Sequence, residues 1–397
     1  MRWITKFLKG FTLLLASACI TESLAGQVDS GFERHSLSFQ GIERVYFLHS
    51  PPSRSETEAK PVVFVLHGGG GADAEEMAQR TGMNAIGDRE GFLVVYPYGV
   101  DGQWNDGRGK TFRRAKDNTN IDDVGFISAM LDELIRSGKA DARRIYVVGL
   151  SNGGMMTYRL GIELGDRLSA IAAIIANLPA NLASQKPVRP LPVLIMNGTA
   201  DPMMPWDGGS VRVLGREYGE VLSTANTVRY WVRAADMPES PTKKNLEDRV
   251  TDDQSTVEME MYRDPRRSLE VLLYKVVGGG HNLPGGQTPD RPRLLGSKNM
   301  DINAMEEVWA FFKKYKLDSP KRPNESTPNQ KARQTKIEQL GDPKANYLNA
   351  EFTSDGRYMV WFEGTEDWST NGIVWHCGVD PNTGESGSAG RPGFSRF

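Results

Sequence analysis

Ser151, Asp201 and His281 have the residue types and the chain order of a nucleophile, an orienting acid and a general base. Ser151 lies in the segment Gly-Leu-Ser-Asn-Gly-Gly at 149–154, which follows an apolar run and precedes helix-forming residues. This order predicts a strand, a sharp turn and a helix, in which the flanking glycines remove side chains that would clash. The turn lifts the serine hydroxyl clear of the sheet. The competing interpretation, a glycine-rich turn with a bystander serine, leaves the flanking strand and helix unexplained.

Asp201 and His281 each follow a predicted strand, at 193–196 and 269–276. A serine hydroxyl needs a base to accept its proton, and that base needs an acid to hold its imidazole in the right tautomer. The order Ser, Asp, His is that of α/β-hydrolases. Singly, the acid could be a turn residue before a proline and the histidine a surface residue, but together they predict a catalytic triad. Asp207 is the alternative acid.

The segment Leu-His-Gly-Gly-Gly-Gly at 66–71 offers backbone N–H groups that no side chain obstructs. Such groups can form an oxyanion hole, and we expect the N–H of Gly69 to act with that of Asn152, the residue after the nucleophile. Gly70 is the alternative donor. A phosphate-binding loop is the competing interpretation, but no Lys-Ser or Lys-Thr follows the glycines. His67 is expected to brace this loop, not to act as the base.

The elements that would position these residues alternate between strand and helix. Continuous apolar runs at 62–66 and 92–96 indicate strands covered on both faces, and a helix-compatible stretch at 73–86 separates them. Further helices are expected at 124–136, 224–235 and 302–315, and further strands at 145–148, 171–175, 193–196 and 269–276. This pattern predicts an α/β fold with a doubly wound, mostly parallel sheet and helices on both faces. Open sheets of this kind place their sites at the carboxyl ends of the strands.

Two short alternating runs, at 36–39 and 44–48, predict an antiparallel hairpin at one edge of this sheet. Asp122 and Asp123 stand just before the helix expected at 124–136. We expect them to cap that helix and to place favourable charge at its start.

Seven segments, spread over residues 35 to 317, match a known family. They are 66–71, 91–97, 104–105, 122–127, 149–156, 197–201 and 278–281. On these motifs the chain resembles the secreted polyhydroxybutyrate depolymerase-like and feruloyl esterase-like serine esterases, relatives of carbohydrate esterase family 1. The resemblance implies an α/β-hydrolase fold and hydrolysis of a carboxylic ester through an acyl-serine intermediate. The substrate would be a carboxylic ester. If it is a polymer, it would be a polyester or a plant cell-wall polysaccharide that carries ester groups.

Three further residues are expected to contact the substrate: Trp104, Trp206 and Leu283. Leu283 stands where the family often has Trp, and 107–109 replaces a region that contains cysteines in some relatives. These departures leave the triad intact and concern the acyl or alcohol pocket. Pockets in this fold are shaped by loops that no motif encodes, so the sequence does not name the ester.

Two alternatives to an esterase remain open. A serine peptidase of the prolyl-oligopeptidase type shares the sheet and often carries a β-propeller, but there the propeller normally precedes the hydrolase. A non-catalytic binding protein on a hydrolase scaffold is the other, and an intact triad argues against it. Turnover of an activated ester separates the enzyme from the binding protein.

Composition excludes several partners. The chain has 397 residues, 39% of them hydrophobic and 25% charged, with a formal net charge of −2. This charge implies neither a nucleic acid nor an anionic membrane as partner. No metal-ligand spacing occurs, and we expect no metal and no cofactor. Cys19 and Cys377 are the two cysteines, so removal of the first by signal cleavage would leave no internal disulfide.

Residues 1–25 have the pattern of a signal peptide, with Arg2, Lys6 and Lys9 before an apolar run at 11–18. That run is under half the roughly 20 residues that cross a bilayer, so we expect no transmembrane span and a secreted or periplasmic protein. A lipid anchor at Cys19 is the alternative, because residues 16–19 resemble a lipobox that has Ala in place of the usual Leu.

We expect residues 27–317 to form the catalytic domain and residues 318–344, rich in proline and polar residues, to form a linker. Residues 345–397 contain alternating aromatic strands around an Asp-Gly turn and resemble a single blade of a β-propeller. One blade cannot close a propeller, so either the sequence is cut short or this tail docks elsewhere.

Overall fold

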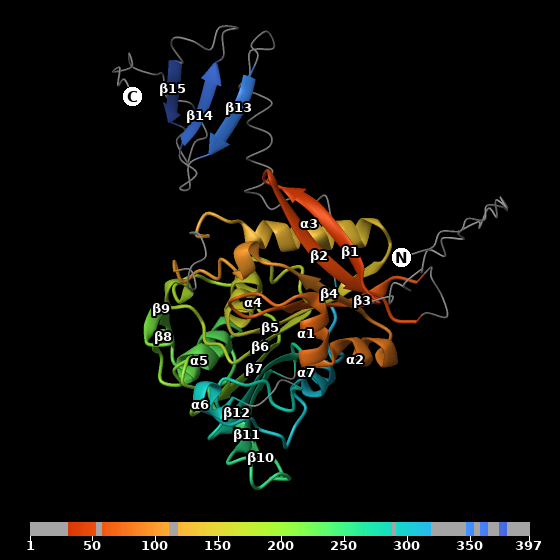
Figure 1. The fold of residues 1–397 in the computed structure, drawn as a ribbon, viewed down its shortest axis with the longest axis vertical. Helices are drawn as coiled ribbons and strands as arrows, with labels where there is room; N and C mark the ends of the chain where they lie inside the picture. Colours follow the sequence, from red (N-terminus) through yellow and green to blue (C-terminus); the bar gives the residue numbers. More distant parts are fainter. Residues whose placement is uncertain are drawn as a thin grey trace, which may run out of the picture. The chain divides into compact units, whose positions relative to one another are not determined.

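The structure, a computed structural model, describes residues 31–52, 58–110, 118–264, 266–287 and 291–318, together with three strands at 347–352, 358–363 and 373–378 (Figure 1). The expected signal peptide, the anchor at Cys19 and the expected linker from residue 319 onward therefore lie outside the described residues. The chain divides into two compact units, residues 1–323 and 324–397. Each unit is described by itself.

A ten-stranded sheet forms the centre of the first unit. Its strands, in the order in which they pair, are β1 (Glu33–Phe39), β2 (Ile42–His49), β4 (Leu93–Pro97), β3 (Lys60–Leu66), β5 (Ala140–Leu150), β6 (Ala170–Ile174), β7 (Val193–Gly198), β12 (Leu269–Val277), β11 (Thr256–Asp264) and β10 (Thr242–Asn245). The strands from β4 to β12 in this order run parallel, and antiparallel strands flank them on both sides.

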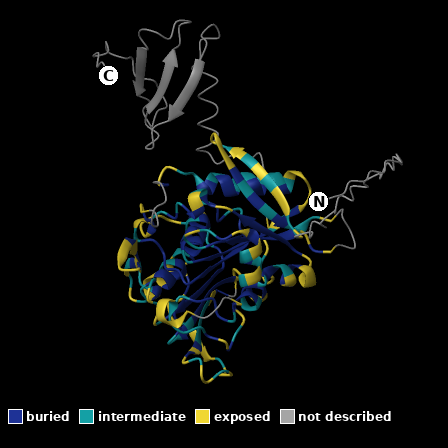
Figure 2. Ribbon diagram, viewed as in Figure 1, coloured by how far each residue is buried: buried dark blue, intermediate teal, exposed yellow. Residues whose placement is uncertain are grey.

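Helices cover both faces of this sheet, so the predicted doubly wound fold is confirmed (Figure 1). They are α1 (Ala74–Thr81), α2 (Met83–Glu90), α3 (Asp123–Arg136), α4 (Asn152–Glu163), α5 (Thr224–Ala234), α6 (Pro292–Leu295) and α7 (Ala304–Phe312). One buried apolar cluster joins α3, α4 and α5 to one face, and a second joins α1, α2 and α7 to the other. The central strands are buried along almost their whole length because both their faces are covered (Figure 2).

The structure confirms the predicted edge hairpin, which is β1 paired with β2 through Gln40 and Gly41. The helix expected at 73–86 is instead two helices. Gly82 adopts φ 65° and its N–H donates to Ala78 O, which ends α1, and α2 starts at the next residue. Asp122 caps α3 as expected, since its side chain accepts a hydrogen bond from Gly125 N.

Asp123 lies in the first turn of α3, as expected, and it also has a second role in the fold. Its carboxylate is buried and forms an ion pair with Arg44 of β2, with Nη2 and Oδ1 2.6 Å apart. Burial nevertheless raises the pKa of this carboxyl above its usual range. Its second oxygen accepts a hydrogen bond from Asn105 N at 2.7 Å, so the pair fixes the segment that precedes residue 106.

Two features of the first unit were not predicted. One is a hairpin of β8 (Gly209–Val213) and β9 (Arg216–Val221), and the other is the antiparallel extension formed by β10 and β11. Short 3-10 turns occur at Val100–Gly102 and Ala180–Leu182. Among the described residues no helix is long and apolar enough to cross a bilayer.

The second unit contains a three-stranded antiparallel sheet of β13 (Tyr347–Phe352), β14 (Tyr358–Glu363) and β15 (Ile373–Gly378). These strands coincide with the alternating aromatic runs of the sequence. The Asp-Gly turn expected between the first two lies outside the described residues.

Candidate active site

Ser151 occupies a sharp turn between β5 and α4. Its backbone has φ 55° and ψ −116°, a conformation that L-residues rarely adopt. A Cβ on Gly149 would lie 2.1 Å from Gly153 O, and one on Gly153 would lie 2.4 Å from His67 O. The glycines on both sides of the serine are therefore required by close backbone approaches, as the predicted turn demanded.

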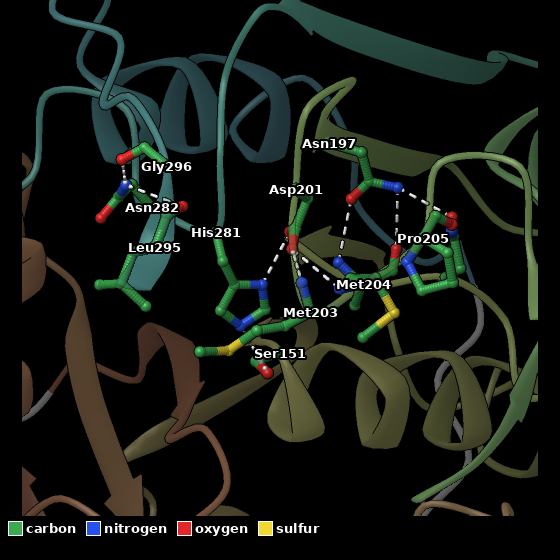
Figure 3. Close-up of polar contacts among 12 residues, drawn as sticks. Ser151, Asn197, Asp201, Met203, Met204, Pro205, His281, Asn282, Leu295 and Gly296 are labelled. Carbon is green, nitrogen blue, oxygen red and sulfur yellow. Dashed lines mark hydrogen bonds and ion pairs between the residues drawn. The ribbon is translucent and has the colours of Figure 1, made fainter. Parts of the chain in front are cut away.

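The structure brings Ser151, His281 and Asp201 into one chain of hydrogen bonds (Figure 3). Ser151 Oγ lies 3.0 Å from His281 Nε2, and His281 Nδ1 lies 2.7 Å from Asp201 Oδ2. The carboxylate can only accept here, so the network assigns the ring proton to Nδ1 and leaves Nε2 free to accept from the serine hydroxyl. Asp207, the alternative acid, is exposed and is not part of this network.

Neighbouring backbone holds both partners of the serine in place. Asp201 follows β7, and its second oxygen accepts hydrogen bonds from Met203 N and Met204 N, each at 2.8 Å. The His281 loop follows β12 and is held through Asn282, whose Nδ2 donates to Gly296 O at 2.9 Å (Figure 3). The Asp201 side chain is 2% exposed and that of His281 is 9% exposed, so both are largely shielded from solvent.

Gly69 and Asn152, the two residues expected to supply backbone donors, line the same cavity as the serine. No hydrogen bond within the described residues uses either N–H group. The N–H of Gly70, the alternative donor, is taken by Gly102 O at 3.1 Å. An oxyanion would find its two free donors in Gly69 and Asn152.

His67 uses both ring nitrogens on the backbone. Nε2 accepts from Gly99 N at 3.0 Å, which leaves the proton on Nδ1 to be donated to Gly68 O at 2.8 Å. The side chain is buried, and burial lowers the pKa of the imidazole to about 4. His67 therefore braces the glycine loop as a neutral group, as expected.

A cavity of about 730 Å³ opens over Ser151. Much of its lining is apolar, and these residues include Met155, Ile175, Met203, Val211, Val213, Leu214, Leu283, Leu294 and Leu295. Beyond Ser151, Asn152 and His281, the polar lining comes from Glu76, Gln79 and Arg80 of α1 and from Arg108, Asn282, Gln287 and Arg291. The cavity therefore suits a ligand that has an apolar part and a polar part.

The sequence profile of the family described as Esterase PHB depolymerase matches residues 44–177, which include Ser151. A putative esterase named NocK, from Nocardia uniformis subsp. tsuyamanensis, is 33% identical over 279 residues, covering 68% of this chain and 80% of NocK. The chain belongs to this esterase family. As a member of it, the esterase is a carboxylic ester hydrolase.

The esterase is also 26% identical to feruloyl esterase B of Piromyces equi over 215 residues, which are 53% of this chain but 37% of that protein. Among solved structures, it resembles acetyl xylan esterase from Aspergillus awamori with a TM-score of 0.46 and 13% identity. That likeness covers 71% of this chain and 99% of the other.

Two of the residues expected to contact substrate are not among those that line the cavity of the esterase. Trp104 is 2% exposed and packs beside His67, with ring centroids 4.8 Å apart, behind the glycine loop. Trp206 packs against the apolar cluster on the α4 and α5 face. Leu283 does line the cavity. The expectation for the two tryptophans was wrong because an aromatic residue near a motif can support a loop as readily as it can face a ligand.

Sequence reasoning missed the wall that the β8–β9 hairpin of the esterase contributes. Val211, Val213 and Leu214 of this hairpin line the cavity. The signal was present, since the apolar residues at 211 and 213 alternate with polar ones and Leu-Gly follows at 214–215. The side chain of Asn152 was also missed, because the expectation for this residue concerned its N–H alone.

Proposed function

We propose that this esterase cleaves its substrate through an acyl-serine intermediate, with Ser151 as nucleophile, His281 as general base and Asp201 as the acid that orients it. The observation that carries the proposal is the position of the imidazole, whose Nε2 meets the serine hydroxyl while Nδ1 meets the carboxylate. This is the arrangement that a serine needs to lose its proton as it attacks.

In the proposed first step, Ser151 Oγ attacks the ester carbonyl carbon and its proton passes to His281 Nε2. The carbonyl oxygen becomes an oxyanion that accepts hydrogen bonds from the N–H groups of Gly69 and Asn152. The carbon–oxygen bond to the alcohol then breaks, and the alcohol leaves with the proton from Nε2. Water repeats the sequence on the acyl-serine, which releases the carboxylic acid and restores the free hydroxyl.

For the substrate, we propose a polyhydroxyalkanoate-like ester or a feruloyl or acetyl ester of a plant cell-wall polysaccharide. The apolar lining of the cavity supports an acyl or alcohol group with an apolar part. The family description names polyhydroxybutyrate depolymerases, and relatives are named feruloyl esterase and acetylxylan esterase/xylanase. Action outside the cytoplasm is part of this proposal and depends on the signal peptide expected at residues 1–25.

Replacement of the nucleophile tests the mechanism. Ser151→Ala should lower turnover of p-nitrophenyl butyrate by at least about three orders of magnitude, because no second nucleophile is positioned to replace the hydroxyl. Ser137→Ala, at an exposed serine after α3, is the control and should retain full turnover. Wild-type turnover by folded Ser151→Ala would refute the proposal. Methyl ferulate, acetylated xylan, polyhydroxybutyrate film and a prolyl peptide then distinguish the substrate classes.

A further inference from the structure

The segment 99–104 holds the glycine loop through three hydrogen bonds. Gly99 N donates to His67 Nε2 at 3.0 Å, Gly70 N donates to Gly102 O at 3.1 Å, and Trp104 Nε1 donates to His67 O at 2.9 Å. The bond from Trp104 is the one formed by an indole, and its ring packs beside His67. One of the two proposed oxyanion donors, Gly69, lies in the loop held in this way.

Trp104 also holds the residue that carries the other proposed donor. Its main-chain N–H donates to Asn152 Oδ1 at 2.9 Å, and its main-chain carbonyl accepts from Asn152 Nδ2 at 3.2 Å. Asn152 Nδ2 donates in addition to Asp106 Oδ2 at 2.6 Å. Both Trp104 and Asn152 are 2% exposed, so water does not compete for these bonds.

We propose that Trp104 is a positioning residue that sets the spacing between the two oxyanion donors. Its indole N–H fixes the carbonyl of His67 in the loop that carries Gly69, and its main chain fixes the side chain of Asn152. The inference rests on the proposed function, because it requires the N–H groups of Gly69 and Asn152 to receive the oxyanion.

The physical reason is that an oxyanion hole stabilises the transition state through hydrogen-bond donors that are already in position before the reaction begins. Each N–H must stand about 2.7–3.1 Å from the position that the oxyanion will take, and losing one donor costs about 10²–10³ in kcat. Trp104→Phe keeps an aromatic ring and all main-chain bonds, but removes the one bond to His67 O. The loop then keeps the two hydrogen bonds made by Gly99 and Gly70, so it should stay folded but less closely fixed.

The experiment compares Trp104→Phe with Trp231→Phe in the full chain. Trp231 lies in α5, is also 2% exposed, and its indole N–H has no hydrogen-bond partner among the described residues. Both changes remove an indole from a buried site, but only the first removes a hydrogen bond. We expect Trp104→Phe to lower kcat on p-nitrophenyl butyrate about tenfold or more with KM within about twofold. Trp231→Phe should leave both constants within about twofold.

A trifluoromethyl ketone whose acyl chain has the length of butyrate adds a second readout. The ketone forms an oxyanion adduct with the serine, so its affinity depends on the oxyanion donors and would not change if Trp104 had a purely structural role. Its affinity for Trp104→Phe should fall by the same factor as kcat/KM. Should Trp104→Phe not fold, Asn152→Ala takes its place, since it keeps the N–H of residue 152 but removes the side-chain clamp. The same loss of kcat and of ketone affinity is expected.

Unchanged kcat in Trp104→Phe, or lowered kcat with unchanged ketone affinity, would overturn the assignment of Trp104 while an inactive Ser151→Ala leaves the proposed function standing. An active Ser151→Ala would instead remove the proposed function itself. The two failures are thus distinguished by which variant departs from expectation.

Discussion

Ser151 and Ile175 follow neighbouring strands, line the cavity and have unfavourable backbone conformations, with φ 55° and φ 49°. A positive φ is unusual for any residue with a side chain and is costly for a β-branched one such as isoleucine. The sheet maintains both conformations, since Ser151 N donates to Ile174 O at 3.0 Å and Ile175 N to Met196 O at 2.8 Å. Strain at Ser151 is thus held by main-chain bonds between neighbouring strands.

The buried neutral state of His67 makes a testable contribution to stability. Its pKa is about 4 in the folded chain against 6.5 for the unperturbed group, so protonation favours the unfolded chain. The contribution is fully present above pH 6.5 and is lost as the pH falls towards 4. By linkage, it amounts to about 2 kcal/mol between pH 7 and pH 5. Urea unfolding of the wild type at these two pH values should show this loss.

His67→Gln is the matched variant, because it cannot titrate. It should be less stable than the wild type at pH 7, because the substitution removes the bracing hydrogen bonds of His67. Between pH 7 and pH 5, its free energy of unfolding should change by about 2 kcal/mol less than that of the wild type. Carboxylates titrate alike in both proteins and cancel in the comparison. Parallel pH profiles for the two proteins would mean that His67 is not held neutral by burial.

At the residue scale, the sequence was sufficient for the contacts that recur with a motif. The turn at Ser151 and the oxyanion role proposed for the N–H of Asn152 follow from Gly-x-Ser-x-Gly between a strand and a helix. The amide contacts of Asn152 with Trp104 and Asp106 could not be predicted, because they join segments 46 and more residues apart through side-chain geometry alone. No spacing rule in a single sequence encodes such a contact.

At the scale of elements, the β8–β9 hairpin forms an apolar wall of the cavity, and its turn carries an unusual residue. Leu214 is 65% exposed and has φ 50°, followed by Gly215 with φ 75°. Asparagine tolerates this conformation better than leucine does, so Leu214→Asn should not lower the melting temperature. Because Leu214 lines the cavity, the same change should raise KM for p-nitrophenyl octanoate about fivefold. KM for p-nitrophenyl acetate, whose acyl chain is short, should stay within about twofold of the wild-type value.

Val188→Asn is the control for this prediction, since Val188 is 55% exposed and does not line the cavity. It should change KM for neither ester. Equal effects of Leu214→Asn on the octanoate and the acetate would show that the hairpin turn does not contact the longer acyl chain.

Elements with buried faces and the β1–β2 hairpin at one edge of the sheet could be predicted, but β10 and β11 at the opposite edge and the β8–β9 hairpin could not. β6 and β7 read as continuous apolar runs because both faces are covered, and their order along the chain was clear. β11 was missed although its residues alternate between apolar and polar, because the methionines and glutamates that make up this pattern also favour helices. The break between α1 and α2 was missed because a single Gly82 is tolerated inside many helices.

At the scale of the whole molecule, the first unit closes on itself near residue 317. Leu317 N donates to Arg143 O at 2.8 Å, Leu317 O accepts from Arg143 Nε at 2.9 Å, and Tyr315 O accepts from Tyr146 OH at 2.6 Å. These bonds attach the segment after α7 to β5, the strand that leads to Ser151. Among the described residues, all those that line the cavity precede this closure.

We therefore expect a chain of residues 27–318 to be soluble and to hydrolyse p-nitrophenyl butyrate within about twofold of the full chain. A chain ending at residue 303 is the control. It lacks α7, whose Val308, Trp309 and Phe312 are buried against the sheet, so it should fail to fold. Activity on polyhydroxybutyrate film is measured alongside, because a loss there alone would assign the second unit to polymer adsorption. Aggregation of the 27–318 chain, or loss of its small-ester turnover, would show that the second unit is needed by the hydrolase fold and that the boundary near 317 is wrong.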